Sequence, residues 1–508
     1  MIDSERLFRC MFHGLLARSD DYPPKDGLYQ DYTYFKPAPL DKIRDAWKNT
    51  VRLIRDGKAP ENIILYIHWP FCPSQCTYCF CSMTVSQNRR EWDNYTRSLM
   101  REMDAFRDVF KGVELHSVYF GGGTPTYITE SQLDALFKHI RSCFKLRRGA
   151  EIYFEASPAT LTAKKVDLLR RHGVNRITLG LQTRDDAVLR GVNRKGQSKE
   201  AVERAWKLLA GCRGIIRDVD LMVGLEGQTR MSFLQDLIWS IRKGADIIHI
   251  QSFDPRAQTL FSRKRKRKDA DYWRVMAKTV EIAEGVLKTA GYGMTHYDLQ
   301  RGVGTSEEKI LSDDPFELSS VLALGKHGKA HAFGSAWYQH PPVRAGGFRS
   351  DRIPPFQYIP ADLDEEMRCY VIRSLCLHER VNLPAFRRLF GRELNEDVEV
   401  YRPLLELAQW GKVRLGTSEI RLASRTPLER LIWLKHLYHE SVLNDVIAKH
   451  RGRFAEFKRA YKRDPENTLR QLRTKAEART YHLVYYQGFG GGRRRLPTEN
   501  ETRQLAAL

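Results

Sequence analysis

Between residues 61 and 300, short apolar runs alternate with amphipathic stretches. The runs are rich in β-branched and aromatic residues, which is typical of buried strands. One amphipathic stretch begins with a capping box at 129–132, followed by an apolar face of Leu133, Leu136, Phe137, Ile140 and Phe144. The alternation predicts repeated βα units and therefore a parallel sheet. The predicted strands are 63–67, 116–120, 151–155, 175–180, 216–223 and 246–251.

The pattern changes on both sides of this region. Residues 1–60 hold aromatic residues without a regular period and end in a predicted helix at 40–56; we interpret them as an aromatic arm that either covers the next domain as a lid or packs on its outside. Residues 361–440 predict a second, mainly helical unit, with a hairpin near 412–422 that indicates a winged-helix-like module. Residues 441–508 form a basic tail whose final glycines and charges predict disorder.

Composition narrows the class of protein. A chain of 508 residues can form a full-sized barrel and a second domain. No apolar run approaches the 18 or so residues of a membrane span, and the charged start MIDSERLFRC is unlike a secretory signal. Nine cysteines, four of them crowded into one loop, do not resemble a disulfide framework. We therefore expect a cytoplasmic protein without a membrane span.

The formal net charge of +22 is compatible with a nucleic acid, an anionic small substrate or simply a basic surface. The unbroken basic run at 263–268 is interpreted as a solvated loop, because isolated charge runs are usually solvated. No RNA-binding module is recognisable, so nucleic acid is not the expected partner.

The chemistry is concentrated in the loop after the first strand of the sheet. Cys72, Cys76 and Cys79 have the spacing C-x-x-x-C-x-x-C, and Cys81 follows. Three thiolates so close together can hold a [4Fe–4S] cluster and leave one iron open for a small chelating ligand. The alternative is a structural zinc site. Zinc sites usually combine two separated knuckles, and the other cysteines are scattered singly, so the cluster is favoured.

This loop resembles that of the radical S-adenosylmethionine (SAM) superfamily, and more narrowly that of the oxygen-independent coproporphyrinogen III dehydrogenases, or HemN-like proteins. The resemblance covers about residues 60 to 440 and depends on several motifs in order. It implies an α/β fold: an open, partial (β/α)6 TIM-like barrel at 61–360 and a smaller, mainly helical C-terminal domain at 361–440. The motifs are LYIHWPFCPSQCTYCFC at 65–81, GGGTPT at 121–126, Glu155, GLQ at 180–182, VNR at 192–194, DLMVGLEGQT at 220–229 and RCYVIRSLCL at 368–377.

The resemblance also implies cofactors and partners. Cys72, Cys76 and Cys79 are expected to ligate the cluster, with Cys81 superfluous. Two SAM molecules are expected, the second lying toward Gln182, Arg194 and Asp220. An electron donor such as flavodoxin or ferredoxin is implied as well. The positions that match the family's SAM-binding residues are Tyr66, Tyr78, Gly122, Gly123, Thr124, Glu155, Gln182, Arg194 and Asp220.

The sequence departs from the dehydrogenases at two places. It has Lys326, His327, Lys329 and His331 where they have a glycine-rich segment, and LQT at 181–183 where they have VQD. His327 and His331 are candidate catalytic proton acceptors, because an imidazole titrates near neutral pH. These departures favour methyl or methylene transfer to an sp² carbon of an anionic or aromatic small molecule. The alternatives are oxidative decarboxylation of coproporphyrinogen III and a non-catalytic haem or cluster carrier.

Overall fold

The protein is described from a computed structural model. The structure describes residues 4–16, 36–79, 81, 83–253, 270–295, 320–326, 328–340, 353–423, 433–470, 483–488 and 497–507. The basic run at 263–268 and His327 lie outside the described residues.

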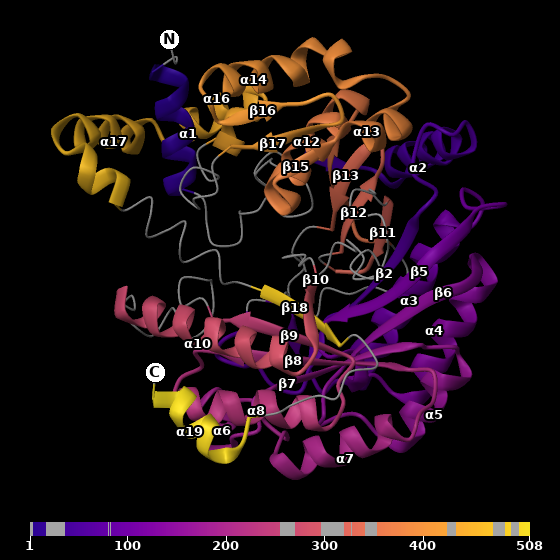
Figure 1. The fold of residues 1–508 in the computed structure, drawn as a ribbon. Helices are drawn as coiled ribbons and strands as arrows, with labels where there is room; N and C mark the ends of the chain where they lie inside the picture. Colours follow the sequence, from indigo (N-terminus) through magenta and orange to yellow (C-terminus); the bar gives the residue numbers. More distant parts are fainter. Residues whose placement is uncertain are drawn as a thin grey trace.

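A sheet of thirteen strands dominates the molecule (Figure 1). Its central strands, β11 through β9 in the spatial order β11-β2-β5-β6-β7-β8-β9, are parallel. All six predicted strands are present in the predicted sequence order, and the seventh, β11, returns beside β2. The parallel strands are β2 (Ile63–Trp69), β5 (Glu114–Gly122), β6 (Lys145–Ala156), β7 (Arg176–Gln182), β8 (Ile216–Val223), β9 (Ile247–Ser252) and β11 (Ser320–Leu324).

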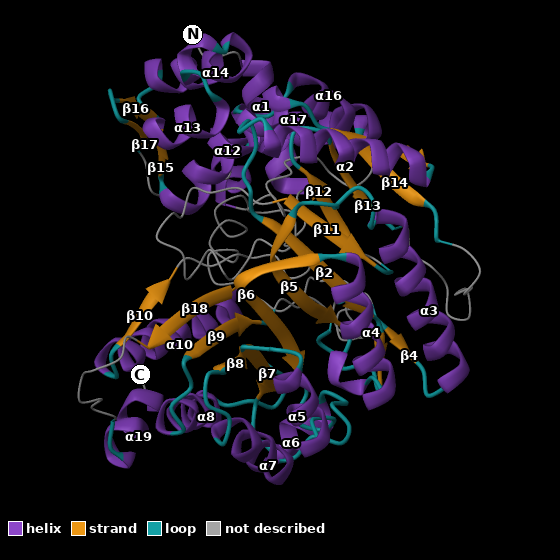
Figure 2. Cartoon of the chain, turned by 90° about the vertical axis from the view of Figure 1, so that its right-hand side faces the viewer, coloured by secondary structure: helices purple, strands orange, loops and turns teal. Residues whose placement is uncertain are grey.

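The helices between these strands cover the outer face of the curved sheet (Figure 2). The predicted capping box of Thr129 and Gln132 begins α4, and the apolar face behind it is buried, as its spacing predicts. The helices are α3 (Arg89–Phe106), α4 (Glu130–Cys143), α5 (Ala163–Arg171), α6 (Asp186–Gly191), α7 (Lys199–Ala210), α8 (Arg230–Arg242) and α10 (Ala270–Thr289).

Side chains alternate between the two faces of each parallel strand. In β7, Ile177, Leu179 and Leu181 belong to the main apolar core, whereas Arg176 and Thr178 make polar contacts on the opposite face. The functional motifs were expected at the carboxyl ends of these strands, next to this polar face. We call the inner face of the curved sheet, where these polar side chains lie, the chamber.

Antiparallel strands extend the sheet on both sides. On one side they continue from β11, and α2 (Leu40–Arg55) packs against them. The segment that contains Lys329 and His331 therefore forms a strand, not the loop expected from its sequence. These strands are β12 (Lys329–Ala332), β13 (Ala336–Gln339), β14 (Phe356–Pro360) and β1 (Lys36–Ala38).

The C-terminal unit is mainly helical, and its predicted hairpin is present as β16 and β17. The first helix, α1 (Ser4–Leu16), packs on this unit, where the rings of Phe12 and Phe454 lie 5.1 Å apart. The elements are α12 (Leu363–His378), β15 (Arg380–Asn382), α13 (Leu383–Phe390), α14 (Val398–Gln409), β16 (Val413–Leu415), β17 (Glu419–Leu422), α16 (Glu440–Lys449) and α17 (Arg451–Arg463).

The end of the chain is more structured than its composition predicts. Strand β18 (Leu483–Gly488) pairs antiparallel with β9 and with β10 (Tyr292–Thr295), so the tail extends the second side of the sheet. Helix α19 (Glu499–Ala507) packs against α8, and Arg230 donates a hydrogen bond to the carbonyl oxygen of Ala506. The expected disorder of the final residues is therefore wrong for α19, because this helix finds a partner in the distant barrel. None of the described helices is long and apolar enough to cross a membrane.

A buried ion pair joins α3 to the end of β13. His340 Nε2 lies 2.5 Å from Glu102 Oε1, and the second oxygen of Glu102 accepts a bond from the backbone N–H of Gly325. Burial lowers the pKa of His340, but Glu102 raises it by more, so the net shift is upward. The folded protein thus binds this proton more tightly than the unfolded chain.

The Glu102–His340 pair should make stability depend on pH. Its contribution is complete below the pKa of an unfolded histidine, about 6.5, and is lost as the pH rises through the raised folded-state pKa. We expect His340→Gln to lower the thermal unfolding midpoint more at about pH 5.5 than at about pH 8.5. Equal losses at the two pH values, followed by circular dichroism, would contradict the assignment.

Candidate active site at the carboxyl edge of the sheet

The cysteine loop starts directly after β2 and is fixed by the loop after β5. The backbone N–H of Gly123 donates to the carbonyl oxygen of Trp69 at 2.7 Å, and that of Thr124 donates to Phe71 at 3.1 Å. The hydroxyl of Thr124 lies 3.1 Å from the sulfur of Cys72. Cys72 itself is on the short strand β3 (Phe71–Cys72), which pairs with β4 (Thr84–Val85). The GGGTPT segment is thus adjacent to the first cysteine.

Two glycines in this segment allow the close approach. A Cβ at Gly123 would lie 2.7 Å from the carbonyl oxygen of Pro70 and 3.0 Å from the sulfur of Cys72. Gly122 has φ +114°, and a Cβ there would lie 2.8 Å from both the His68 ring and the backbone oxygen of Trp69. Contacts this short with backbone atoms leave no room for a side chain.

Arg194 holds the other end of the cysteine loop. Its Nη1 donates to the Tyr78 hydroxyl at 2.8 Å and lies 3.8 Å from the sulfur of Cys76. Its Nη2 donates to the carbonyl oxygen of Gly180 in β7, and its Nε donates to Gln197 at 2.8 Å. The guanidinium therefore joins the loop to the carboxyl end of the sheet, and its donors are directed at protein atoms.

The thiols are crowded, and Cys72 is buried while Cys76, Cys79 and Cys81 are half-buried. Burial is the main reason that the pKa of Cys72 rises to about 12, and the neighbouring Cys76 and Cys81 raise it further. The hydrogen bond that the protonated Cys79 thiol makes to Cys81, followed by burial, raises the pKa of Cys79 well above its usual value. Thiolates placed this way need a compensating positive charge, which bound iron supplies. The residues present therefore fit a metal cluster.

A row of tyrosines lines the chamber below the loop. Tyr66, Tyr119 and Tyr153 are register partners on β2, β5 and β6, and the rings of the last two stack at 4.4 Å. The Tyr66 hydroxyl lies 2.9 Å from His68 Nδ1, and the Tyr119 hydroxyl donates to Glu155. Glu155 is thus held near the carboxyl end of β6, as its match to the family predicts.

Gln182 and Asp220 lie at the ends of the next two strands. Gln182 has φ +64°, follows a register shift between β7 and β8, and is 5 % exposed. Its Oε1 is buried and has no hydrogen-bond partner among the described residues. A strained backbone and an unsatisfied buried oxygen are both costly, and both are common at ligand sites. Asp220 Oδ1 lies 2.8 Å from His249 Nδ1.

Comparisons with known proteins agree with this geometry. The model of the Radical SAM superfamily matches residues 66–239. The heme chaperone HemW of Escherichia coli is 31 % identical over 267 residues, which cover 52 % of this chain and 69 % of that protein. The oxygen-independent coproporphyrinogen III oxidase of Escherichia coli is 32 % identical over 250 residues, which cover 47 % of this chain and 54 % of the oxidase.

The chain belongs to the HemN-like radical SAM family. Its fold also matches the structure titled coproporphyrinogen III oxidase (HemN) from Escherichia coli, a radical SAM enzyme, with a TM-score of 0.63 and 23 % identity, over 80 % of this chain and 95 % of that one. The cofactors are therefore a [4Fe–4S] cluster and SAM. The match spans only about half the length of the curated oxidase.

In this radical SAM protein, the structure separates His331 from the cysteine loop. His331 pairs with Val321, which is level with Ile64 near the start of β2, whereas the cysteines follow the end of β2. The five residues from Ile64 to Trp69 span about 17 Å. The ring of His331 stacks on Trp337 at 3.7 Å, and its Nε2 lies 2.6 Å from Glu366 of α12. These contacts indicate that His331 has a structural role.

Lys326 lies much closer to the cluster loop. It follows β11, is 5 % exposed, and donates to the hydroxyl of Thr84 in β4 at 2.9 Å. Burial lowers the pKa of its ammonium group. The first residue of the segment in which the sequence departs from the dehydrogenases thus packs beside β3 and β4.

Sequence reasoning missed several residues of the chamber. They are Tyr119, Tyr153, Asp218 and His249, which all lie on parallel strands: Tyr119 bonds to Glu155, His249 bonds to Asp220, and both Tyr153 and Asp218 bond to Thr178. The available signal was the alternation of polar and apolar residues in these strands. Short strands buried on both faces hide that alternation, since both faces are removed from solvent.

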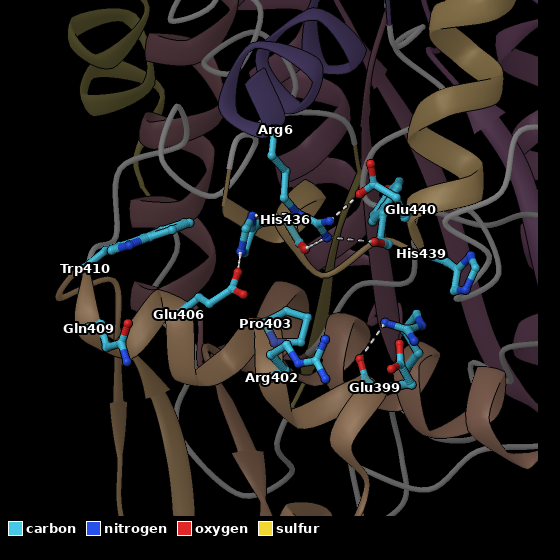
Figure 3. A pocket seen from close by; sticks show the side chains of 12 residues that line it. Arg6, Glu399, Arg402, Pro403, Glu406, Gln409, Trp410, His436, His439 and Glu440 are labelled. Carbon is cyan, nitrogen blue, oxygen red and sulfur yellow. Dashed lines mark hydrogen bonds and ion pairs between the residues drawn. The ribbon is translucent and has the colours of Figure 1, made fainter. Parts of the chain in front are cut away.

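A cavity of about 530 Å³ lies elsewhere, in the C-terminal unit (Figure 3). Four of its charged or titratable lining residues are paired with one another: Arg6 of α1 donates to Glu440, and His436 Nε2 lies 2.7 Å from Glu406 Oε2. It contains none of the predicted cluster or SAM residues. We therefore place the radical chemistry at the cysteine loop.

Gly123→Ala should damage the cluster site. The new Cβ would collide with the Pro70 carbonyl and the Cys72 sulfur, so we expect reconstituted protein to hold less than half of the native iron and sulfide. Gly191→Ala is the matched control, because a Cβ there meets no atom within 4 Å. Native iron content in Gly123→Ala would show that the loop is not packed as described.

Proposed function

We propose that Cys72, Cys76 and Cys79 ligate the cluster, and that the protein cleaves SAM reductively at its open iron. The observation that carries this proposal is the convergence on the cysteine loop of Thr124 after β5 and of Arg194 after β7. When bound, the cluster supplies the electron that splits SAM into methionine and a 5′-deoxyadenosyl radical. The protein's residues then hold SAM and substrate in place and exclude water.

The described contacts suggest how the chain divides this work. The glycine backbone at 121–123 offers a surface without side chains on which the amino-acid part of SAM can lie. Glu155, fixed by Tyr119, can accept a hydrogen bond from the amino group. Asp220 can accept bonds from ribose hydroxyls, and Gln182 can use its unsatisfied oxygen in the same way. Tyr66 contacts His68 near the end of β2, where the loop begins, and Tyr78 accepts a hydrogen bond from Arg194 within the loop.

A second SAM molecule is part of the proposal, lying toward Gln182, Arg194 and Asp220. Gln182 and Asp220 face the chamber beyond the cysteine loop, and their polar groups are buried. Arg194 has a different role in this arrangement. Because it bonds to Tyr78, Gly180 and Gln197, it shapes the wall of this second position more than it offers a free donor.

For the reaction, we favour oxidative decarboxylation of coproporphyrinogen III. The support is the name of the curated oxidase relatives. The similarity to the solved oxidase structure supports the fold alone, because the sequence identity is only 23 %. The preference for methyl transfer depended on His327 and His331 as proton acceptors. His331 instead bonds to Glu366 and lies level with the start of β2, away from the cysteine loop. His327 lies outside the described residues. That support for methyl transfer has therefore weakened.

Methyl or methylene transfer to an sp² carbon is the second candidate. It is favoured by Lys326, which fills the position where the resemblance leads us to expect a glycine-rich wall. A changed wall next to the cluster is a reason to expect a changed substrate. Haem carriage, suggested by the name of the HemW relative, would need no substrate radical. In every case the expected ligand is an anionic or aromatic small molecule, and the expected electron donor is a flavodoxin- or ferredoxin-like protein.

The cysteine assignment predicts a contrast between two variants. Cys76→Ala should lose the brown chromophore and SAM cleavage, because a three-thiolate cluster lacks a replacement ligand. Cys81→Ala should keep both, since it is superfluous to that ligand set. Iron analysis and detection of 5′-deoxyadenosine measure the two properties. Cleavage in Cys76→Ala, or loss of the cluster in Cys81→Ala, would overturn the ligand set.

The reaction can be tested anaerobically with coproporphyrinogen III, SAM that carries a deuterated methyl group, a one-electron reductant for the cluster, and an electron acceptor that takes the electron released as carbon dioxide leaves the substrate radical. We expect protoporphyrinogen IX without deuterium, and one 5′-deoxyadenosine for each propionate decarboxylated. A product that contains deuterium would support methyl transfer instead. Binding of haem without SAM cleavage by the fully reconstituted protein would contradict both reactions and favour a carrier.

A further inference from the structure

The carboxylate of Asp220 is held from the neighbouring strand. Asp220 and His249 are register partners on β8 and β9, and His249 Nδ1 lies 2.8 Å from Asp220 Oδ1. Asp220 is 7 % exposed and His249 is 2 % exposed. Because a carboxylate accepts hydrogen bonds, this contact places a proton on Nδ1 of the imidazole.

A second carboxylate lies on the other side of the same ring. Asp218 Oδ2 is 3.8 Å from His249 Nε2, and Asp218 is fully buried. Asp218 and Asp220 are two residues apart on one strand, so both side chains point into the chamber, about 7 Å apart at their Cα atoms. The imidazole separates two acidic groups that would otherwise face each other across a poorly solvated space.

Asp218 is itself fixed by a buried arginine. Arg176 Nε donates to Asp218 Oδ2 at 2.8 Å, and the Thr178 hydroxyl donates to the same oxygen at 2.9 Å. Arg176 is fully buried, bonds to Glu151 at 3.1 Å and lies over the Tyr153 ring. A chain of contacts therefore runs from Glu151 on β6 through Arg176, Asp218 and His249 to Asp220.

The chain of contacts leads from the buried part of the sheet to the expected SAM site. At Arg176 it is level with Tyr153, the last tyrosine of the row, and its final member, Asp220, is the carboxylate expected to meet a ribose. A carboxylate that binds a diol needs one fixed orientation, and a buried side chain keeps that orientation only if its other partners are fixed too. His249, on the neighbouring strand, bonds directly to Asp220.

We propose that His249 is a positioning residue for SAM: it holds the Asp220 carboxylate in the orientation that accepts the ribose hydroxyls, and the Arg176–Asp218 pair holds His249. The proposal deepens the proposed function, because it depends on Asp220 contacting SAM. It assigns to this chain a contact that neither the motifs nor the comparisons identify.

Two substitutions of similar size separate hydrogen bonding from packing. In His249→Asn, the amide nitrogen takes the place of Nδ1 and can still donate to Asp220. In His249→Gln, the amide extends to the place of Nε2, so the bond to Asp220 is lost. His172→Gln controls for the substitution outside the site, since His172 lies in the outer helical layer and its Nε2, whose place the Gln amide takes, is 2.8 Å from a carboxylate oxygen of Asp134.

The readout is SAM affinity of the reconstituted holoprotein, measured by equilibrium binding, with iron content and unfolding midpoint measured on the same samples. We expect His249→Gln to weaken SAM binding about tenfold, the usual effect of losing a hydrogen bond to a charged group. His249→Asn should stay within about threefold of the native protein. His172→Gln should bind SAM normally, and all variants should keep the cluster.

Each contrary result has a distinct meaning. Native affinity in His249→Gln would overturn the proposal. Equal weakening in the Asn and Gln variants would overturn it too, because it would show that ring volume matters and the Nδ1 bond does not. If the native holoprotein fails to bind or cleave SAM, the proposed function fails, whatever the His249 variants do.

Discussion

The structure depends most on the clamp that holds the cysteine loop to the sheet. Arg194 joins Cys76 and Tyr78 to the backbone of β7, while Gly123 and Thr124 bind the backbone of the loop's first residues. The two attachments come from different βα units, so the loop is fixed only when the parallel sheet is complete. Buried thiols otherwise retain their protons, and the clamp confines them where bound iron can replace those protons.

The two faces of the sheet lie in different environments. Its outer face packs against helices through residues such as Ile177 and Leu179, while its inner face carries tyrosines, carboxylates and Arg176. Buried charges are costly unless they are paired, and those inside the chamber pair across adjacent strands. That pairing fixes the inner side chains without water. It also lets a small number of residues at the carboxyl edge, such as Gln182, keep unsatisfied polar atoms for a ligand.

Local signals in the sequence predicted the six strands, the capping box at Thr129 and the cysteine loop. Long-range contacts could not be predicted this way. Strand β18 lies in what looks like a basic tail, and helix α19 in its apparently disordered end, until β9 and α8 provide partners. His331 looks like a polar residue in a loop, but Trp337 and Glu366 make it part of a strand's packing. His249 was missed because its importance comes from Asp220, its partner in the folded sheet.

The central claim is that the three thiolates leave one iron open for SAM. Electron–nuclear double resonance on the reduced holoprotein tests it most directly, using SAM labelled with ¹⁵N in its amino group and ¹⁷O in its carboxylate. The account predicts hyperfine coupling from both labels, because both groups chelate the open iron. A fully reduced cluster in the presence of saturating SAM, with coupling from neither label, would contradict it.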